Sequence, residues 1–561
     1  MSFFVSLVAM FLTNFYVDDF VTLIIFGLAF LVVNLLVAKI FSVWSSLANL
    51  LYSSLIYSFV SLFLYAVIFL ITSFSLVEGI ILIILLILFV AEALLCLAEV
   101  FTQMNSLFRI RNIRISKPWD KPLKRYPKVS IHIPTKKEPP EMVIETLAGL
   151  ERLNYPNFEV IVVDNGTEEE ALWRPVEKYC KEKSEKFKFF HVGELSGFKA
   201  GALNLALKHT ASDSEIICVI DADYLVVPEF LKETVGYFED EKIAIVQTPQ
   251  SFRGWEWSKY FVSCFWVYRY FFAVNMISNN MDNAASFMGT MGLFRKNILE
   301  TIGEWSEKTI TEDIEVGFRV HSKGYKTVYI DKAFGKGFIP DEFKSYKKQR
   351  ERWTFGNVQV LKQHWKKFLP GVKSGLNFWQ KVNYFAAISI WMNLLLPVTI
   401  ILLILVILYN FGMAFSWPIL FVIMFTIGSY IFRRTFGFLY ILKNLIKQKF
   451  STMFWALVSF YSLTLAMAYA TLDGFITKQF VFKRTSKFTH RPKIRDNWKY
   501  AFKELAITLI CLFFAISIVV VIGGFESWLI AVLLIIYALI FSTTSYNFVL
   551  NVLEQGKEHK L

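Results

Sequence analysis

Long apolar runs flank a central block of mixed polar and apolar sequence. Residues 1–105 and 386–550 are mostly apolar, whereas residues 106–375 have the patterning of a globular domain. A helix crosses a bilayer with about 20 apolar residues, and runs of that length lie on both sides of the block. We therefore predict seven membrane spans, at residues 20–42, 48–73, 77–103, 386–409, 415–432, 501–523 and 526–549.

Two further apolar segments are interpreted differently. Residues 3–16 are short for a span and fit an interfacial or extracytoplasmic helix. Residues 451–475 are apolar enough to cross, but a crossing there would place the strongly basic loop 478–499 outside the cell. Because basic loops stay on the cytoplasmic side, we interpret residues 451–475 as an interfacial amphipathic helix.

Charged residues beside the spans predict the orientation. Asp18 and Asp19 precede the first span and Lys39 lies at its far end, while Arg109 and Arg114 follow the third span. Positive charges collect on the cytoplasmic side, which predicts a plasma-membrane protein with its N-terminus outside and its central block in the cytoplasm. The N-terminus lacks the basic region and cleavage site of a secretory signal, so we expect no cleavage.

These patterns predict four regions. The central block of about 270 residues is long enough for one complete core. We expect an N-terminal membrane region with three spans, a cytoplasmic globular domain with interfacial helices, a C-terminal membrane region with four spans, and a short cytoplasmic tail. Their boundaries are 1–105, 106–375, 376–550 and 551–561.

Composition supports a membrane protein and narrows its partners. The 561 residues are 55% hydrophobic with a mean hydropathy of +0.47, above the roughly 45–50% of soluble domains. The net charge of +13 would suit nucleic acid, but the basic residues cluster beside apolar segments, as cytoplasmic loops do. We therefore expect a lipid bilayer and an anionic donor as partners, and no nucleic acid. The five cysteines form no CxxC pair, which argues against a zinc site or a disulfide framework.

Within the central block, apolar strand-like runs alternate with helical patterns. The expected strands are 128–134, 157–163 and 215–220, and the expected helices are 141–152, 168–184 and 199–209. This alternation predicts a parallel α/β sheet, in which ligands bind beyond the carboxyl ends of the strands. Asp164, Asp221 and Asp223 fall at those ends and are expected to line one crevice, although such residues are also common turn formers.

Asp221 and Asp223 carry the metal signal. Alternate residues of an extended segment point to the same side, so the two carboxylates would need a cation between them. Two oxygen ligands together with substrate phosphates suit Mg²⁺ or Mn²⁺.

Lys199 and Asp313 stand at the starts of predicted helices. Lys199 follows a glycine-containing loop, where it can meet a phosphate, although an ordinary helix start would look the same. Thr311-Glu312-Asp313 opens an apolar-periodic helix, where carboxylates are often caps. A carboxylate positioned there can also act as a general base, for example by accepting the proton of a sugar hydroxyl that attacks an anomeric carbon.

In this order, and followed by Gln349-Arg350-Glu351-Arg352-Trp353, these motifs resemble the membrane-embedded family 2 glycosyltransferases. That family includes cellulose, hyaluronan, chitin and β-1,3-glucan synthases. The resemblance runs from about Val129 to Lys487. It implies a helical membrane protein with an inserted α/β catalytic domain of the GT-A, Rossmann-like class. It also implies a processive, inverting enzyme that polymerises a β-linked polysaccharide from a UDP-sugar and moves the growing chain across the membrane.

The resemblance also implies residue roles. Asp313 would be the catalytic base, Glu312, Gln349 and Trp353 would contact the acceptor, and Arg352 would stabilise the leaving diphosphate. The donor nucleotide would be held by Thr135, Glu138, Asp164, Lys199, Asp221 and Asp223, the last two also at the metal. The loop 134–138 lacks the tyrosine and asparagine usual before its acid.

A basic stretch near the C-terminus resembles the gating loop that closes over the donor in cellulose-type synthases. Its matching residues are Phe482, Arg484, Thr485 and Lys487. Arg484 departs from the usual valine. A basic loop that lies on anionic lipid would have the same composition.

Other local stretches, such as Gln247–Gln250 and Phe189–Val192, resemble bacterial β-1,3-glucan synthases, which favours UDP-glucose as the donor. A non-processive enzyme acting on a lipid-linked acceptor is the alternative, and a transporter with a sugar-nucleotide domain is a third hypothesis. The sequence indicates neither an oligomeric state nor an accessory secretion protein.

Two carboxylates lie within the third predicted span. Glu92 and Glu99 are seven residues apart and share one helix face. Carboxylates inside spans face protein or water. We expect the pair either to line a polymer path or to stand near the cytoplasmic end as ordinary interface charges.

Overall fold

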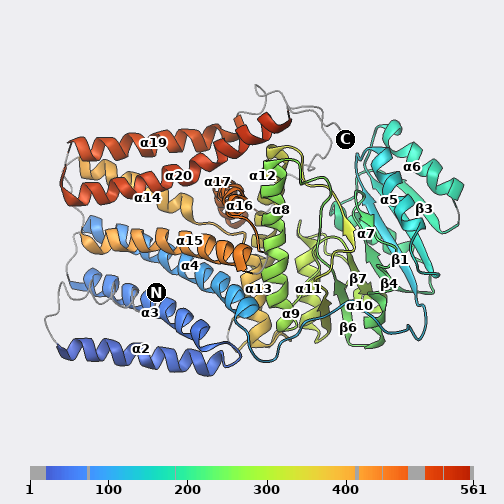
Figure 1. Ribbon diagram of the computed structural model, residues 1–561, viewed down its shortest axis with the longest axis horizontal. Coiled ribbons are helices and arrows are strands. Elements are labelled where there is room, and N and C mark those ends of the chain that lie inside the picture. Colours follow the sequence, from blue (N-terminus) through green and yellow to red (C-terminus); the bar gives the residue numbers. More distant parts are fainter. Residues whose placement is uncertain are drawn as a thin grey trace. The chain divides into compact units, whose positions relative to one another are not determined.

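The computed structural model divides into two compact units, each described by itself (Figure 1). One, here the membrane unit, comprises Met1–Ile113, Met392–Thr471 and Arg491–Leu561. The other, the catalytic unit, comprises Arg114–Trp391 and Leu472–His490. The structure describes residues 20–72, 76–183, 185–369, 371–410, 416–444, 447–477, 499–521 and 523–555. The predicted helix 3–16 and the gating-like residues 482–487 lie outside these ranges.

Apolar helices build the membrane unit. All seven predicted spans are helical: α2 (Phe20–Ile40), α3 (Ser46–Thr72), α4 (Leu76–Leu107), α14 (Leu395–Asn410), α15 (Trp417–Asn444), α19 (Lys499–Val521) and α20 (Gly524–Gln555). In the described part of the chain, six helical segments are long and apolar enough to cross a membrane. They include five of the predicted spans and residues 450–476, whereas the apolar parts of α2 and α14 are shorter. The count of seven is therefore approximate.

Two predicted spans have limits that differ from those of the corresponding helices. The fourth span was expected to begin at residue 386, but α14 begins at Leu395, where the Asn393 side chain accepts a hydrogen bond from the Leu395 amide (2.8 Å). Asparagine at that position satisfies an amide that the helix leaves unpaired. The fifth span was expected to end at residue 432, but α15 continues to Asn444 because Arg433 and Arg434 are buried inside the unit.

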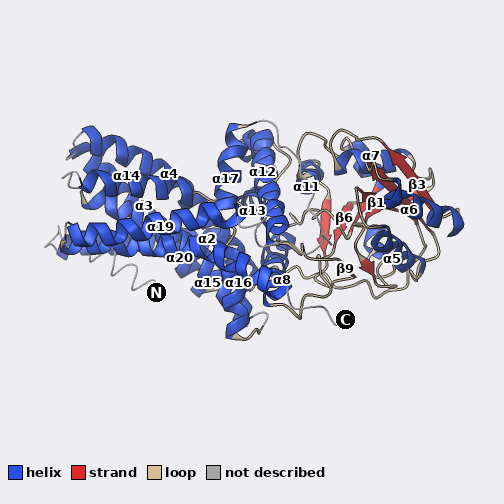
Figure 2. Cartoon of the chain, turned by 90° about the horizontal axis from the view of Figure 1, so that it is seen from above, coloured by secondary structure: helices blue, strands red, loops and turns tan. Residues whose placement is uncertain are grey.

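Residues 451–475 form two helices instead of one. Helix α16 (Phe450–Tyr461) ends at Ser462, and α17 (Thr464–Ile476) follows it. Figures 1 and 2 show α16 lying across the direction of α15 and α20. Length and composition alone would let this segment span, but the break and the crosswise direction agree with the interfacial prediction.

Glu92 and Glu99 belong to a buried ion-pair network between α4 and α15. Arg433 donates from Nε to Glu92 (2.7 Å) and from Nη1 to Glu99 (2.7 Å), while Arg434 donates from Nη1 to Glu99 (3.3 Å). No more than 2% of any of these four side chains is exposed. The glutamates are therefore not interface charges, because each has a buried arginine partner.

The catalytic unit contains a seven-stranded sheet in the order β3-β2-β1-β4-β7-β6-β8. Its strands are β1 (Lys128–Thr135), β2 (Phe158–Asn165), β3 (Phe187–Val192), β4 (Ser214–Val219), β6 (Ile243–Gln247), β7 (Gly292–Arg295) and β8 (Lys326–Tyr329). The three predicted strands are confirmed. These three strands run parallel as predicted, whereas β7, which was not predicted, runs antiparallel to both of its neighbours. A separate antiparallel pair joins β5 (Leu225–Val226) to β9 (Gly335–Lys336).

Helices cover both faces of this sheet (Figure 2). The predicted helices are α5 (Pro140–Glu151), α6 (Glu170–Lys183) and α7 (Lys199–Lys208). Along β4, Ile216 and Cys218 pack into the core on one face, while Ile217 and Val219 pack into the core on the other. This two-sided burial explains why the strand is a continuous apolar run. The same burial holds β4 in place, and Asp221, which lines the pocket, comes just after its carboxyl end.

Candidate active site

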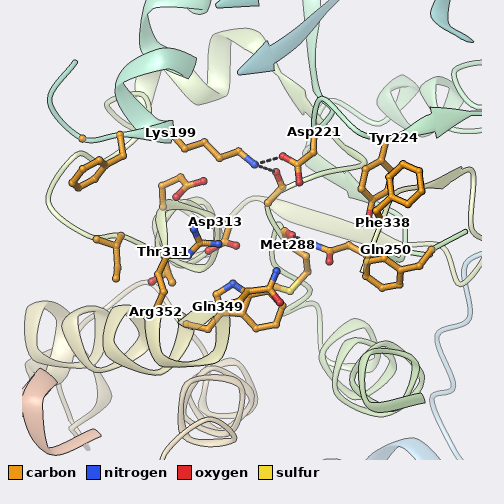
Figure 3. A pocket seen from close by; sticks show the side chains of 17 residues that line it. Lys199, Asp221, Tyr224, Gln250, Met288, Thr311, Asp313, Phe338, Gln349 and Arg352 are labelled. Atoms are coloured by element: carbon orange, nitrogen blue, oxygen red, sulfur yellow. Dashed lines mark hydrogen bonds and ion pairs between the residues drawn. The ribbon is translucent and has the colours of Figure 1, made fainter. Parts of the chain in front are cut away.

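A pocket opens beyond the carboxyl end of β4 (Figure 3). Its walls come from the start of α7, the start of α11 (Glu312–Ser322) and one face of α12 (Phe343–Phe368). It is lined by Gly197, Phe198, Lys199, Asp221, Tyr224, Gln250, Phe252, Met288, Gly289, Ile310, Thr311, Glu312, Asp313, Phe338, Gln349, Arg352 and Trp353. Seven of the predicted site residues are among them, although more than 150 residues of sequence separate the first from the last.

Lys199 and Asp221 form an ion pair on one wall. Lys199 donates from Nζ to Asp221 Oδ1 (2.5 Å) and to the carbonyl of Gly289 (2.7 Å). Burial opposes a charged lysine, but Asp221, Glu312 and Asp313 together raise the pKa of Lys199 above its usual value. The amine is therefore held as a cation at the entrance to α7, where a phosphate group would meet it.

Glu312 and Asp313 lie in the first turn of α11. Burial, followed by the neighbouring Asp313, raises the pKa of Glu312 to about 7. Burial also raises the pKa of Asp313, against the opposing effects of the Ile314 amide and Lys199. Gly289 gives these groups room: its backbone has φ +85°, and a methyl group there would lie 3.3 Å from Asp313 Oδ2. The site therefore contains two neighbouring carboxyl groups that are unusually hard to ionise.

Helix α12 supplies Gln349, Arg352 and Trp353. Residues three and four apart share a helix face, which brings these three side chains to the same pocket. Figure 3 shows the Arg352 side chain pointing toward Asp313. Burial lowers the pKa of the Arg352 guanidinium, while Glu312, Asp313 and Asp221 oppose that shift. The three carboxylates thus face two cations, Lys199 and Arg352.

A close approach fixes α12 against the start of α11. Gly356 lies directly over Thr311, and a methyl group at this glycine would come within 2.5 Å of the threonine Cγ2. Farther along, Glu315 of α11 accepts hydrogen bonds from Arg319 (2.8 Å) and pairs with His364 of α12 (3.2 Å). Two contacts therefore hold the Asp313 helix at a set distance from the Arg352 helix.

The structure corrects the geometric argument for Asp221 and Asp223. The segment is a turn, closed by the Tyr224 amide donating to the Asp221 carbonyl (3.1 Å), and not an extended strand. Asp221 lines the pocket, whereas Asp223 is only 3% exposed and accepts a hydrogen bond from the Phe338 amide (2.8 Å). Strand alternation therefore does not apply to this pair.

Asp164 lies in a separate polar cluster at the ends of β1, β2 and β3. Its carboxylate accepts hydrogen bonds from Thr135 Oγ1 (3.2 Å) and Thr167 Oγ1 (2.6 Å), and it contacts His191 Nδ1 (2.8 Å). The His191 ring stacks on Trp173 (4.1 Å between centroids). Neither Asp164, Thr135 nor Glu138 lines the pocket described above.

Sequence reasoning assigned no site role to several aromatic and polar residues. Gln250 lines the pocket and donates to the Met288 carbonyl (2.5 Å). Tyr268 of α8 (Lys259–Phe271) donates to Gln349 Oε1. Gln250 ends the Gln247–Gln250 stretch that carries the resemblance, which was the signal for it. Tyr268 belongs to an aromatic amphipathic stretch that fits acceptor stacking and membrane contact equally well, so the sequence assigned it neither role.

The fold and the pocket define a glycosyltransferase. The model of the family described as Glycosyl transferase family group 2 matches residues 216–543, which is more than half of the chain. The protein is a member of this family, and the predicted enzyme class and GT-A-like fold class are confirmed at this level. With its candidate spanning helices, it is a multi-pass membrane protein.

Two curated relatives are similar to part of this chain. "Probable glucomannan 4-beta-mannosyltransferase 14" of Arabidopsis thaliana is 30% identical over 281 residues, which cover 46% of this chain and 50% of the relative. "Cellulose synthase 1 catalytic subunit [UDP-forming]" of Komagataeibacter xylinus is 27% identical over 273 residues, covering 47% of this chain and 35% of the relative. The chain thus spans half or less of the length of these relatives.

Among solved structures, the mannosyltransferase PcManGT from Pyrobaculum calidifontis, in complex with GDP-Man and Mn²⁺, aligns with a TM-score of 0.46 at 17% identity. The alignment covers 69% of this chain and 98% of that chain.

Proposed function

We propose that this protein is a processive, inverting glycosyltransferase that builds a β-linked polysaccharide from a UDP-sugar and passes it across the membrane. One observation carries the proposal: a single pocket holds a carboxylate pair, two cations and an indole. Glu312 and Asp313 face Lys199 and Arg352, and Trp353 lies on the same wall. Inversion by single displacement needs one base and one group that stabilises the leaving diphosphate, and this pocket offers both.

Asp313 is the proposed base. As the acceptor hydroxyl oxygen attacks the anomeric carbon, its proton passes to the Asp313 carboxylate, and the bond to the donor diphosphate breaks. Arg352 and Lys199 take up the negative charge that develops on the diphosphate, because guanidinium and ammonium groups pair with phosphate oxygens. Trp353 would stack on the acceptor sugar, since an indole face suits the C–H face of a pyranose, with Glu312 and Gln349 beside it.

A divalent cation, Mg²⁺ or Mn²⁺, fits the acidic side of this pocket. Among the described residues, no three His, Cys, Asp or Glu side chains are grouped as a complete metal site. Magnesium is commonly held by one or two carboxylates and by substrate phosphates, and Asp221 can supply such a ligand. When bound, the ion would neutralise diphosphate charge. Asp223 remains a proposed second ligand, although its carboxylate caps the Phe338 amide.

The carboxylate pair predicts a pH profile. Activity requires an ionised base, and the pKa of Glu312 is raised to about 7 beside an Asp313 whose pKa is also raised. We therefore expect kcat/KM to fall on the acidic side as the Asp313 carboxyl becomes protonated, at a higher pH than an ordinary aspartate would require, and to level off above that pH. Glu312→Gln should move this acidic limb to lower pH, because the remaining carboxyl no longer ionises beside a like charge. Initial rates at saturating metal across pH 5 to 9 measure both profiles, and an unchanged limb in the variant would contradict the pairing.

The relatives support a polymerase more than a lipid glycosyltransferase. The two relatives are named as a cellulose synthase subunit and a glucomannan mannosyltransferase. We propose a β-glucan made from UDP-glucose, with similarity to bacterial β-1,3-glucan synthases resting on the local motifs alone. Phe482, Arg484, Thr485 and Lys487 would close over the bound donor, and Thr135, Glu138 and Asp164 would hold its base. The catalytic unit would lie in the cytoplasm, and the N-terminus outside the plasma membrane.

Product analysis tests the function directly. Purified protein in lipid nanodiscs would be given single UDP-sugars or GDP-mannose with Mg²⁺ or Mn²⁺, and the product would be sized and then digested with linkage-specific glycosidases. We expect a long β-glucan from UDP-glucose. Transfer limited to one or two sugars, or label recovered only in a lipid extract, would favour the non-processive alternative.

A further inference from the structure

Arg350 lies in an aromatic box behind the pocket. It is 0% exposed, and its guanidinium carbon lies 4.2 Å from the ring centre of Tyr268, 4.3 Å from Trp353, and 4.9 Å from both Tyr346 and Trp391. Nε and Nη1 have no hydrogen-bond partner among the described residues, and Nη2 has one long contact, to Tyr346 Oη (3.4 Å). The residue is therefore a buried cation held almost entirely by aromatic rings.

Packing alone does not explain an arginine at this position. A cation that leaves water without a carboxylate partner loses more solvation than cation–π contacts easily return. An unbranched apolar side chain of similar length would fill the box without that cost. No ion pair between described residues includes Arg350, so the charge does not serve a salt bridge either.

The box includes one pocket residue, Trp353, and contacts a second, Gln349. Tyr346, Arg350 and Trp353 lie close together along α12, and Trp353 also lines the pocket together with Gln349 and Arg352. The guanidinium lies over the indole of Trp353, and Trp391 meets that indole edge-on (5.3 Å, 68°). The Tyr268 ring, also beside Arg350, donates its hydroxyl to Gln349. Arg350 therefore touches, or is one ring away from, both proposed acceptor contacts.

We propose that Arg350 is a positioning residue for the acceptor: it fixes the Trp353 indole and reserves one face of it for the sugar. Because the guanidinium covers one face, a pyranose that stacks on Trp353 must use the opposite face. This inference rests on the proposed function, because it assigns Arg350 to the acceptor side of that reaction. Among the described residues, neither Lys199 nor Asp221 on the donor side forms a hydrogen bond or ion pair with a residue of the box.

The test separates acceptor binding from donor chemistry. Wild-type, Arg350→Met, Arg350→Lys and Lys366→Met enzymes would be assayed with UDP-glucose for transfer to oligosaccharides obtained by partial hydrolysis of the wild-type polymer. UDP release to water, without acceptor, would be measured in parallel. Met keeps the length of the side chain without its charge, and Lys keeps a cation that can still face the rings. Lys366 is an exposed cation on the same helix and serves as the matched control.

For Arg350→Met we expect an acceptor KM about tenfold higher and a shorter product, as for the loss of one well-oriented aromatic contact. The donor KM and the UDP released to water should stay at wild-type values, Arg350→Lys should recover part of the loss, and Lys366→Met should match wild type. An unchanged acceptor KM in Arg350→Met contradicts the inference alone. Equal losses of acceptor transfer and UDP release in both Arg350 variants also contradict it, because they mean a purely structural role. A wild-type enzyme that forms no polymer from any donor contradicts the proposed function, and this inference with it.

Discussion

Asp313→Asn should lower the rate of sugar transfer by about 10²–10⁴-fold, the range that a positioned general base contributes. The amide keeps the size and can still accept the hydrogen bond from the Ile314 amide (2.8 Å), so α11 should keep its start. It cannot take the acceptor proton, because an amide oxygen is far less basic than a carboxylate. The donor KM should change little, since Lys199 and Arg352 remain in place. Initial rates with UDP-glucose and metal measure the effect.

Asp213→Asn is the matched control for this variant. Asp213 is an exposed carboxylate of the same unit that pairs with Lys128 (2.9 Å) far from the pocket, and its replacement should leave transfer at the wild-type rate. If Asp313→Asn kept wild-type transfer, Asp313 would not be the base and the transporter hypothesis would gain support. A variant that lost donor binding as well as transfer would point to a role in building the pocket.

Arg433→Leu should destabilise the membrane unit by about 3–5 kcal/mol, the cost of breaking a buried ion pair by removing one partner. Glu92 would lose both of its hydrogen bonds to this guanidinium, and Glu99 would keep only the longer one from Arg434. An uncompensated carboxylate in an apolar environment is the source of the loss. The midpoint of thermal unfolding in nanodiscs measures it, by tryptophan fluorescence or by loss of monodispersity.

The double variant Glu92→Leu with Arg433→Leu distinguishes charge from packing. When Glu92 and Arg433 are both removed, Glu99 and Arg434 still pair with each other, and no carboxylate of this network is left without a partner. Much of the lost stability should therefore return. Lys443→Leu, an exposed change near the end of the same helix, should shift the midpoint little. If the single and double variants lose equal stability, the arginine acts through its contacts and not through its charge.

Local patterns predicted three of the seven strands of the sheet, β1, β2 and β4, but not its antiparallel strand. The runs at 128–134, 157–163 and 215–220 are long and apolar because both faces of the sheet are covered. β7 has only four residues, Gly292–Arg295, which is too short to carry a periodic signal. Its direction is set by the neighbours β4 and β6, which local sequence does not record.

The sequence predicted those site residues that belong to short, recognisable motifs. Lys199, Asp313 and Arg352 each stand in a short recognisable stretch, and they line one pocket. The strand alternation assumed for Asp221 and Asp223 was wrong, because the segment forms a turn. The pairing of Arg433 with Glu92 was not predicted, because the two residues lie 341 positions apart in the sequence. Contacts at that separation depend on how helices pack and leave no trace in a hydropathy pattern.

The separation between these partners has a consequence for biosynthesis. Helix α4 leaves the ribosome more than 300 residues before α15, which at about 5–20 residues per second is a delay of roughly 20–60 s. During that interval Glu92 and Glu99 have no arginine to meet. Helix α15, whose hydropathy of 1.5 is far below the 3.3 of α4, then brings both arginines at once. We therefore expect the buried carboxylates of α4 to favour membrane insertion of α15. Loss of either glutamate should first be visible as chains in which α15 is not inserted and which are rapidly degraded.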